Sequence, residues 1–268
     1  MSGHKLFVIP TRVNAPKLRI FCFPFAGGST TTYMPWLKHF NSDTELVFIQ
    51  PPGRGSRMIE PAHDNMNDLI DELMKHGSYI TSTPYVLFGH SLGSRVAYEL
   101  SCQLKSAKLP LPAYFIASGS RAPHLPNEKR QISNLPQDEF MQELEQLNGT
   151  PKEILLNQEL MSFLTPLLRA DFKIAENYQA NKDPMPFPIL VLHGENDSGI
   201  RLEQAAAWDE LSEEKSQLIQ LPGDHFFINQ YLPEVLEQVS IVVNKVMASA
   251  KTSPPNNNTC HKYAIKAL

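Results

Sequence analysis

The feature that most constrains this chain is the pentapeptide Gly89-His90-Ser91-Leu92-Gly93, which lies between a strand pattern and a helix pattern. The apolar run at 85–88 is typical of a buried strand, and apolar residues recur at helical spacing after the second glycine. A serine at such a junction sits on a tight turn, with its hydroxyl above the sheet and glycines where side chains would clash. The following helix directs its N–H groups at charge developing there. This stretch therefore predicts that Ser91 is a nucleophile.

The rest of the chain alternates strand and helix patterns around this turn. Buried strands are predicted at 18–23, 45–50, 85–88, 113–118, 189–192 and 217–221. Residues with helical periodicity separate the first four strands, and a closing helix is predicted over 233–247. This order predicts the α/β class, with a mainly parallel sheet covered by helices on both faces.

The alternation stops over residues 121–186, where no convincing strand pattern occurs. A helix is predicted at 136–147, a second from the capping box Thr150-Pro151-Lys152-Glu153, and a third beginning at Thr165-Pro166. Because this insertion follows a strand, it should lie over the carboxyl edge of the sheet beside Ser91. We expect a helical lid within a single domain spanning 1–249, and a disordered tail over 250–268.

Composition narrows the class of protein. The 268 residues are 42% hydrophobic and 19% charged with a net charge of −4, which suits a soluble domain with a full core. Scattered basic residues argue against a nucleic-acid surface, and no apolar run reaches membrane-spanning length. The N-terminus lacks the apolar stretch of a signal peptide, so a cytoplasmic protein is expected. Cys22, Cys102 and Cys260 are expected to be reduced structural thiols.

A serine hydroxyl needs a general base, and that base needs a carboxylate to orient it. His225 follows the last predicted strand, whereas the other histidines lie in tails, in exposed segments, in the insertion or out of chain order. His90 adjoins Ser91, but neighbouring side chains on a sharp turn point apart. For the acid, Asp197 and Glu195 both follow the strand at 189–192, and Asp197 is preferred. Asp224 is expected to brace the His225 loop.

Two glycine-bearing loops follow the first two strands. The segment Pro24-Phe25-Ala26-Gly27-Gly28 turns sharply and leaves N–H groups free, which favours an oxyanion loop once Ser91 is taken as nucleophile. The segment Pro51-Pro52-Gly53-Arg54-Gly55-Ser56-Arg57 has the glycine density of a phosphate loop but lacks the Gly-Lys-Ser/Thr pattern. We expect it to form a structured loop near the rim of the site.

Together these segments resemble the type II thioesterase family of nonribosomal peptide and polyketide pathways, which has the α/β-hydrolase fold. The resemblance covers about residues 18–247. It is carried by the motifs Phe23-Pro24-Phe25-Ala26-Gly27-Gly28, Pro52-Gly53-Arg54-Gly55, Gly89-His90-Ser91-Leu92-Gly93, Leu168-Arg169-Ala170-Asp171-Phe172, Gly194-x-x-Asp197 and Gly223-Asp224-His225-Phe226-Phe227.

The resemblance implies Ser91 as nucleophile, His225 as general base and Asp197 as its orienting acid. It also implies that the backbone N–H groups of Ala26 and Leu92 form the oxyanion hole, and that a helical lid covers the site. The implied reaction is hydrolysis of an acyl thioester on the phosphopantetheine arm of an acyl or peptidyl carrier protein, which clears stalled or aberrant acyl groups. No metal, nucleotide or other cofactor is expected.

Arg54, Arg57, Arg95 and Arg121 are candidates for contacting an acidic carrier protein near the entrance. Three alternative functions remain open. The chain could be a general acyl-CoA thioesterase or small-ester carboxylesterase, a thioesterase of the synthase-fused type, or a non-catalytic scaffold that binds carriers. The absence of a linker or carrier segment argues against the second, and an intact Ser91, Asp197 and His225 set argues against the third.

Overall fold

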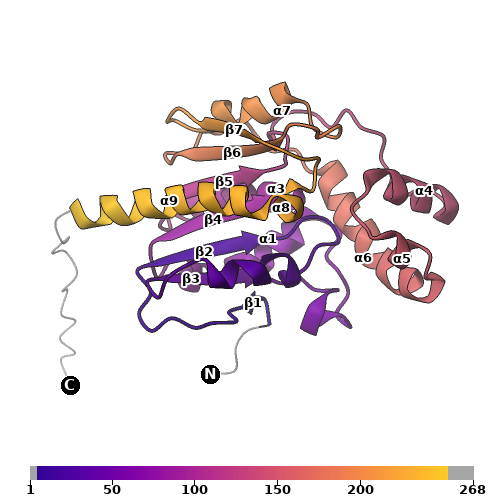
Figure 1. Ribbon diagram of the computed structural model, residues 1–268, viewed down its shortest axis with the longest axis horizontal. Coiled ribbons are helices and arrows are strands. Elements are labelled where there is room, and N and C mark those ends of the chain that lie inside the picture. Colours follow the sequence, from indigo (N-terminus) through magenta and orange to yellow (C-terminus); the bar gives the residue numbers. More distant parts are fainter. Residues whose placement is uncertain (1–4, 253–268) are drawn as a thin grey trace, which may run out of the picture.

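The computed structural model describes residues 5–252 and is built on a seven-stranded sheet with the strand order β1-β3-β2-β4-β5-β6-β7 (Figure 1). The edge strand β1 runs antiparallel to β3, and every other pairing is parallel. The strands are β1 (Phe7–Val8), β2 (Leu18–Phe23), β3 (Thr44–Ile49), β4 (Tyr85–His90), β5 (Tyr114–Ser118), β6 (Ile189–Gly194) and β7 (Gln217–Leu221).

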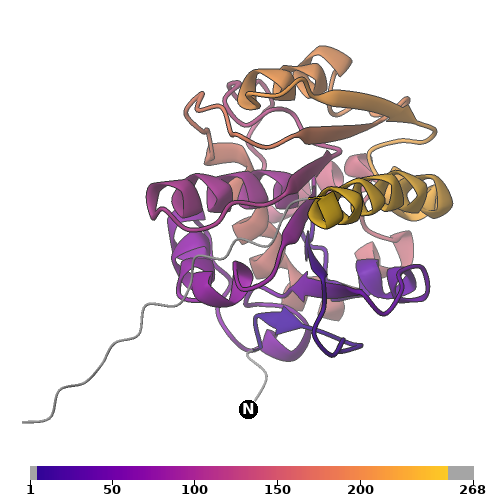
Figure 2. The same cartoon turned by 90° about the vertical axis from the view of Figure 1, so that its left-hand side faces the viewer.

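Helices cover both faces of this sheet because alternate residues along each strand are apolar on opposite sides. In β2, Phe21 and Phe23 join one core cluster, whereas Ile20 and Cys22 join the other. Figure 2 shows the consequence, with α3 and α9 on opposite sides of the sheet. The first face also carries α1, α7 and η3, and the second carries η1 and α8.

The helices outside the insertion are short except for α3 and α9. Their bounds are η1 (Thr30–Lys38), η2 (Gly55–Arg57), α1 (Met66–Met74), α2 (Gly77–Ile80), α3 (Leu92–Ser106), α7 (Leu202–Ala206), η3 (Ala207–Leu211), α8 (Phe227–Gln230) and α9 (Leu232–Thr252).

The segment between β5 and β6 forms a separate helical layer beyond the carboxyl ends of the strands (Figure 1). It contains α4 (Gln137–Leu147), α5 (Lys152–Leu155) and α6 (Gln158–Asn177). These helices bury their own apolar cluster, which includes Phe140, Leu144, Met161 and Leu168. The insertion therefore has a small core of its own.

Of the helix starts predicted in the insertion, one is in the right place but lacks its predicted cap, and one is wrong. Helix α5 is capped by Pro151 with no side-chain hydrogen bond, so the predicted capping box at Thr150 is not formed. Thr165 and Pro166 lie inside α6, which instead begins at Asn157, whose side chain accepts the N–H of Leu160. The Thr165 hydroxyl donates to the Met161 carbonyl 2.6 Å away. That hydrogen bond lies within the turn preceding the proline.

The predicted α/β architecture with a mainly parallel sheet and helices on both faces is confirmed, and the short strand β1 is an element that the sequence patterns missed. Residues 250–252 belong to α9, and the rest of the predicted tail lies outside the described residues. Cys22 and Cys102 are free thiols, and Cys260 also lies outside that range. Within 5–252, no helix is long and apolar enough to span a bilayer.

Candidate active site

Ser91 lies in a strained turn between β4 and α3. Its backbone has φ of 53° and ψ of −113°, a conformation that costs a non-glycine residue free energy. The turn holds because the Ser91 N–H donates to the Ser118 carbonyl at 2.8 Å and because the flanking glycines allow close backbone approach. A Cβ on Gly93 would lie 2.2 Å from the Phe23 carbonyl oxygen, and one on Gly89 would lie 2.4 Å from the Gly93 backbone.

His225 reaches this serine from the loop after β7. Its Nε2 lies 3.0 Å from Ser91 Oγ, and its Nδ1 lies 2.7 Å from Asp197 Oδ2, beyond the end of β6. Because a carboxylate only accepts, Nδ1 donates to Asp197 and Nε2 is left to accept the serine proton. The structure thus brings together all three predicted residues.

Asp197 is fixed as an ionised carboxylate. Its Oδ1 accepts the N–H groups of Gly199 and Ile200 at 2.8 and 3.0 Å. Burial alone would raise the pKa of this carboxyl, but the hydrogen bond from His225 and these two donors outweigh burial and lower the pKa below its ordinary value. Asp197 therefore carries the negative charge that stabilises a protonated His225.

The competing acid, Glu195, has an exposed side chain, and its N–H ties the loop to the Leu221 carbonyl. The structure therefore places Asp197, not Glu195, beside His225. Asp224 braces the histidine loop as predicted, because its Oδ1 accepts the Phe226 N–H at 2.8 Å.

The two predicted oxyanion donors lie on opposite sides of Ser91 in the chain. Leu92 is the first residue of α3, and Ala26 lies in the loop after β2. Across residues 5–252, neither backbone N–H donates to a protein acceptor. Both donors are thus available to a bound group.

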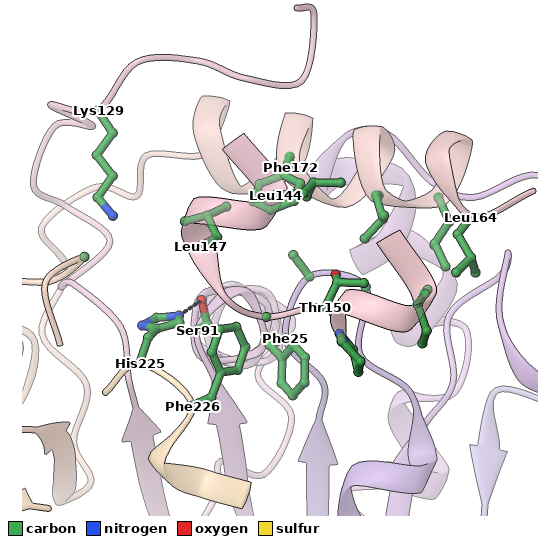
Figure 3. A pocket seen from close by; sticks show the side chains of 18 residues that line it. Phe25, Ser91, Lys129, Leu144, Leu147, Thr150, Leu164, Phe172, His225 and Phe226 are labelled. Atoms are coloured by element: carbon green, nitrogen blue, oxygen red, sulfur yellow. Dashed lines mark hydrogen bonds between the residues drawn. The ribbon is translucent and has the colours of Figure 1, made fainter. Parts of the chain in front are cut away.

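An apolar cavity of about 240 Å³ opens beside Ser91 and His225. Most of its wall comes from the insertion, and Figure 3 shows Leu144, Leu147, Leu164 and Phe172 on one side of Ser91. Leu164 lies farthest from the serine among these labelled side chains, and Lys129 lies above His225 in this view. The cavity can hold an apolar chain whose reacting carbon rests at Ser91.

His90 supports the site from the side of β5 and the His225 loop. Its buried ring lies between Ser118 Oγ and the backbone carbonyl of His225, each 2.9 Å from a ring nitrogen. A carbonyl only accepts, so Nε2 carries the proton and Nδ1 accepts the Ser118 hydroxyl. Burial lowers the pKa of His90 to about 3, so the ring stays neutral. Its position next to Ser91 gave no sequence signal for this role.

The prediction that four arginines face an acidic partner is wrong. Arg54, Arg57, Arg95 and Arg121 are only 5%, 6%, 7% and 3% exposed. Their guanidinium groups bond to internal partners: Arg54 to Asp171, Arg57 to Glu72, Arg95 to the Ala175 carbonyl and Arg121 to the Leu125 carbonyl. These arginines stabilise loops and cannot form a docking face.

Lys129 is the other residue at the site that sequence reasoning missed, because a single lysine in a polar stretch carries no pattern. Within the described part of the chain, no group of at least three His, Cys, Asp or Glu side chains could hold a metal ion.

Comparison with known proteins decides the family. The Thioesterase domain family matches residues 18–241. The chain belongs to this family, whose members are hydrolases that act on thioester bonds. It is 34% identical over 246 residues to gramicidin S biosynthesis protein GrsT from Aneurinibacillus migulanus, covering 91% of this chain and 96% of that protein.

Solved thioesterase structures have the same fold. The crystal structure of ClbQ from the colibactin NRPS/PKS pathway superposes with a TM-score of 0.81 at 29% identity, covering 87% of this chain and 99% of ClbQ. YbtT, a type II thioesterase from the yersiniabactin NRPS/PKS pathway, gives a TM-score of 0.78 at 31% identity, covering 87% of this chain and 96% of YbtT. The predicted α/β-hydrolase fold and thioesterase family are confirmed.

The neutral His90 ring predicts a pH dependence of stability. In the unfolded chain, a histidine takes up its proton near the ordinary pKa of 6.5, whereas folded His90 does so only near 3. The unfolded state therefore binds more protons between these values, and the free energy of unfolding decreases by up to about 1.4 kcal/mol for each unit by which the pH is lowered through this range.

His90→Gln offers an amide donor and acceptor to the same partners without a titrating ring. Urea unfolding of both proteins at a series of pH values should show a shallower slope for the variant below pH 6.5, and parallel curves above it. Equal slopes in both proteins throughout the acid range would contradict the buried neutral ring.

Proposed function

We propose that this protein is a type II thioesterase that hydrolyses aberrant or stalled acyl groups from the phosphopantetheine arm of carrier proteins. The observation that carries the proposal is the hydrogen-bonded series from Asp197 through His225 to Ser91, which ends at the mouth of an apolar cavity. The family assignment and the names of GrsT and YbtT support the substrate class.

In the first step, Ser91 Oγ attacks the carbonyl carbon of the thioester while its proton passes to His225 Nε2. The oxyanion that forms accepts hydrogen bonds from the N–H groups of Ala26 and Leu92. The carbon–sulfur bond then breaks, and the pantetheine sulfur leaves as a thiol with the proton from His225. Asp197 keeps the imidazole oriented and stabilises its positive charge during this transfer.

In the second step, water gives a proton to His225 and attacks the acyl-serine carbonyl. The same oxyanion donors hold the tetrahedral intermediate. Its collapse returns the proton from His225 to Ser91 Oγ and releases the carboxylic acid. The cycle ends with the site in its starting protonation state. His225 takes part in every proton transfer.

The acyl chain would occupy the cavity lined by the insertion, which we propose acts as the lid. Leu144 and Leu147 lie on α4, Ile154 on α5 and Leu164 on α6, so every helix of the insertion contributes to the wall. An apolar wall lowers the free energy of a bound hydrocarbon chain by removing it from water. Acyl selectivity therefore depends on how α4, α5 and α6 pack.

Ser91→Ala tests the proposed chemistry. With the nucleophile removed, kcat should fall by about 10⁴-fold or more on acyl-phosphopantetheinyl carriers, because no acyl-serine can form and His225 has no serine hydroxyl to deprotonate. For the wild type, kcat/KM should be at least about tenfold higher on the carrier than on the same acyl-CoA, a difference of about 1.4 kcal/mol.

Equal or faster turnover of acyl-CoA or simple esters by the wild type would instead assign a general acyl hydrolase. If the variant matched the wild type on carriers, the proposed role of Ser91 would be wrong. Circular dichroism of both proteins shows that the comparison is between folded chains.

Leu164→Trp tests the acyl cavity. The larger side chain would fill the end of the cavity far from Ser91, so kcat/KM for dodecanoyl thioesters should fall by about tenfold or more relative to acetyl thioesters. The matched control is Leu156→Trp, at a leucine that is 73% exposed, which should leave this ratio unchanged. An equal loss for both chain lengths in Leu164→Trp would show that the chain binds elsewhere.

A further inference from the structure

A buried ion pair joins the loop after β3 to helix α6. Arg54 Nη2 lies 2.7 Å from Asp171 Oδ1, and Arg54 Nη1 lies 3.0 Å from Asp171 Oδ2. The two residues are 5% and 3% exposed. This forked geometry is the strongest form of a charge-assisted hydrogen bond, and the pair is shielded from water. Two motifs far apart in the sequence, Pro52-Gly53-Arg54-Gly55 and Leu168-Arg169-Ala170-Asp171-Phe172, thus meet at one contact.

The same pair also holds the loop after β2. Asp171 Oδ2 accepts the Gly27 N–H at 2.7 Å, and Arg54 Nη1 donates to the Gly28 carbonyl at 3.0 Å. Asp171 therefore binds the amide of Gly27, and Arg54 binds the carbonyl of Gly28. These two glycines directly follow Ala26 in the chain. This loop supplies one of the two proposed oxyanion donors, so the pair bears on the position of that donor.

The loop has a conformation that needs such support. The Gly28 N–H donates to the Phe25 carbonyl at 2.8 Å, which closes a four-residue turn, and Gly27 has φ of 73°. A positive φ at the third position is typical of a type II turn. Asp171 accepts the N–H of the central peptide in this turn and so opposes its rotation.

Helix α6 contacts the turn at a second residue. Leu168 lies one turn before Asp171, and its Cδ2 would be 2.5 Å from a Cβ placed on Gly27. Leu168 also lines the acyl cavity and belongs to the core cluster of the insertion. The helix that walls the cavity is thereby in direct contact with the loop that presents Ala26.

We propose that Arg54 and Asp171 are positioning residues for catalysis, which hold the Phe25–Gly28 turn so that the Ala26 N–H meets the oxyanion. This inference rests on the proposed function, because it assumes that an oxyanion forms at Ser91. The pair stabilises the tetrahedral state and leaves binding of the ground-state acyl chain unchanged. It also makes the seating of α6 a condition for a complete oxyanion hole.

The test compares two inhibitors of matched chain length in the wild type and in Asp171→Asn and Arg54→Lys. An alkyl trifluoromethyl ketone adds to Ser91 and forms an oxyanion, whereas the alkyl pantetheine thioether binds without forming one. In Asp171→Asn, the ketone dissociation constant should rise by about 10²-fold, the scale of losing one oxyanion donor, while the thioether dissociation constant stays within about twofold. Arg54→Lys keeps the charge but loses the forked geometry. Its ketone-to-thioether ratio of dissociation constants should therefore lie between those of the wild type and Asp171→Asn.

The matched control is Glu45→Gln in the ion pair between β2 and β3. Glu45 is 4% exposed, accepts the Val13 N–H at 3.1 Å and accepts Arg19 Nε at 2.9 Å, so it has the same kinds of partner as Asp171. It lies near the start of β3, at the opposite end of the sheet from Ser91. This variant should lose thermal stability but keep the wild-type ratio of ketone to thioether affinity.

A ketone-to-thioether ratio in Asp171→Asn equal to that of the wild type or of Glu45→Gln would overturn the inference, because the pair would then act on stability alone. If Asp171→Asn fails to fold, the ratio in Arg54→Lys decides in the same way. Failure of the proposed function has a different signature, since the wild type would then hydrolyse acyl carriers no faster than acyl-CoA, or not at all. The inhibitor ratio is measured by binding and does not depend on that turnover.

Discussion

The close packing of the turn between β4 and α3 is the constraint on which the rest of the site depends. Gly93 approaches the backbone at the end of β2 so closely that a Cβ there would lie 2.2 Å from the Phe23 carbonyl. The same contact therefore fixes Ser91 on one side and the start of the Ala26 loop on the other. Main-chain packing in the sheet thus helps to position the proposed nucleophile and oxyanion donors, and the strain at Ser91 is offset by the buried strands around it.

The helical insertion adds the acyl cavity to the site that the sheet positions. Its own core holds α4, α5 and α6 together, and the inner surface of that layer forms most of the cavity wall. Through Asp171 and Leu168, α6 also contacts the turn that presents Ala26. The wall of the acyl cavity and the loop that presents Ala26 are therefore in direct contact, although Gly27 and Asp171 are 144 residues apart in the sequence.

The sequence predicted those features that depend on local spacing or on chain order. The strand, the glycine-flanked serine and the helix are contiguous, so the turn at Ser91 was visible, and His225 followed from its place after the last strand. The choice between Glu195 and Asp197 needed the structure, because both follow the same strand and only the fold shows which one meets His225. A local pattern also gave a wrong prediction, since Thr165-Pro166 resembles a helix start but lies within α6.

Long-range pairing accounts for the remaining errors. Arg54 looked like a surface cation because its partner, Asp171, lies 117 residues away, and no pattern near either residue reveals the pair. The bracing role of His90 was hidden for the same reason, as its ring contacts a carbonyl 135 residues later. Buried polar groups must find partners, and those partners are set by tertiary contacts that a single sequence does not display.

In the proposed reaction, the acyl group passes through a covalent bond to Ser91. The most direct measurement is to mix the protein with an acyl-phosphopantetheinyl carrier, quench with acid on the millisecond scale, and locate the added acyl mass by peptide mass spectrometry. The acyl group should appear on the peptide that carries Ser91, rising and then falling as free acid appears. Release of free acid with no acyl-Ser91 at any time, or with the acyl group on another residue, would contradict it.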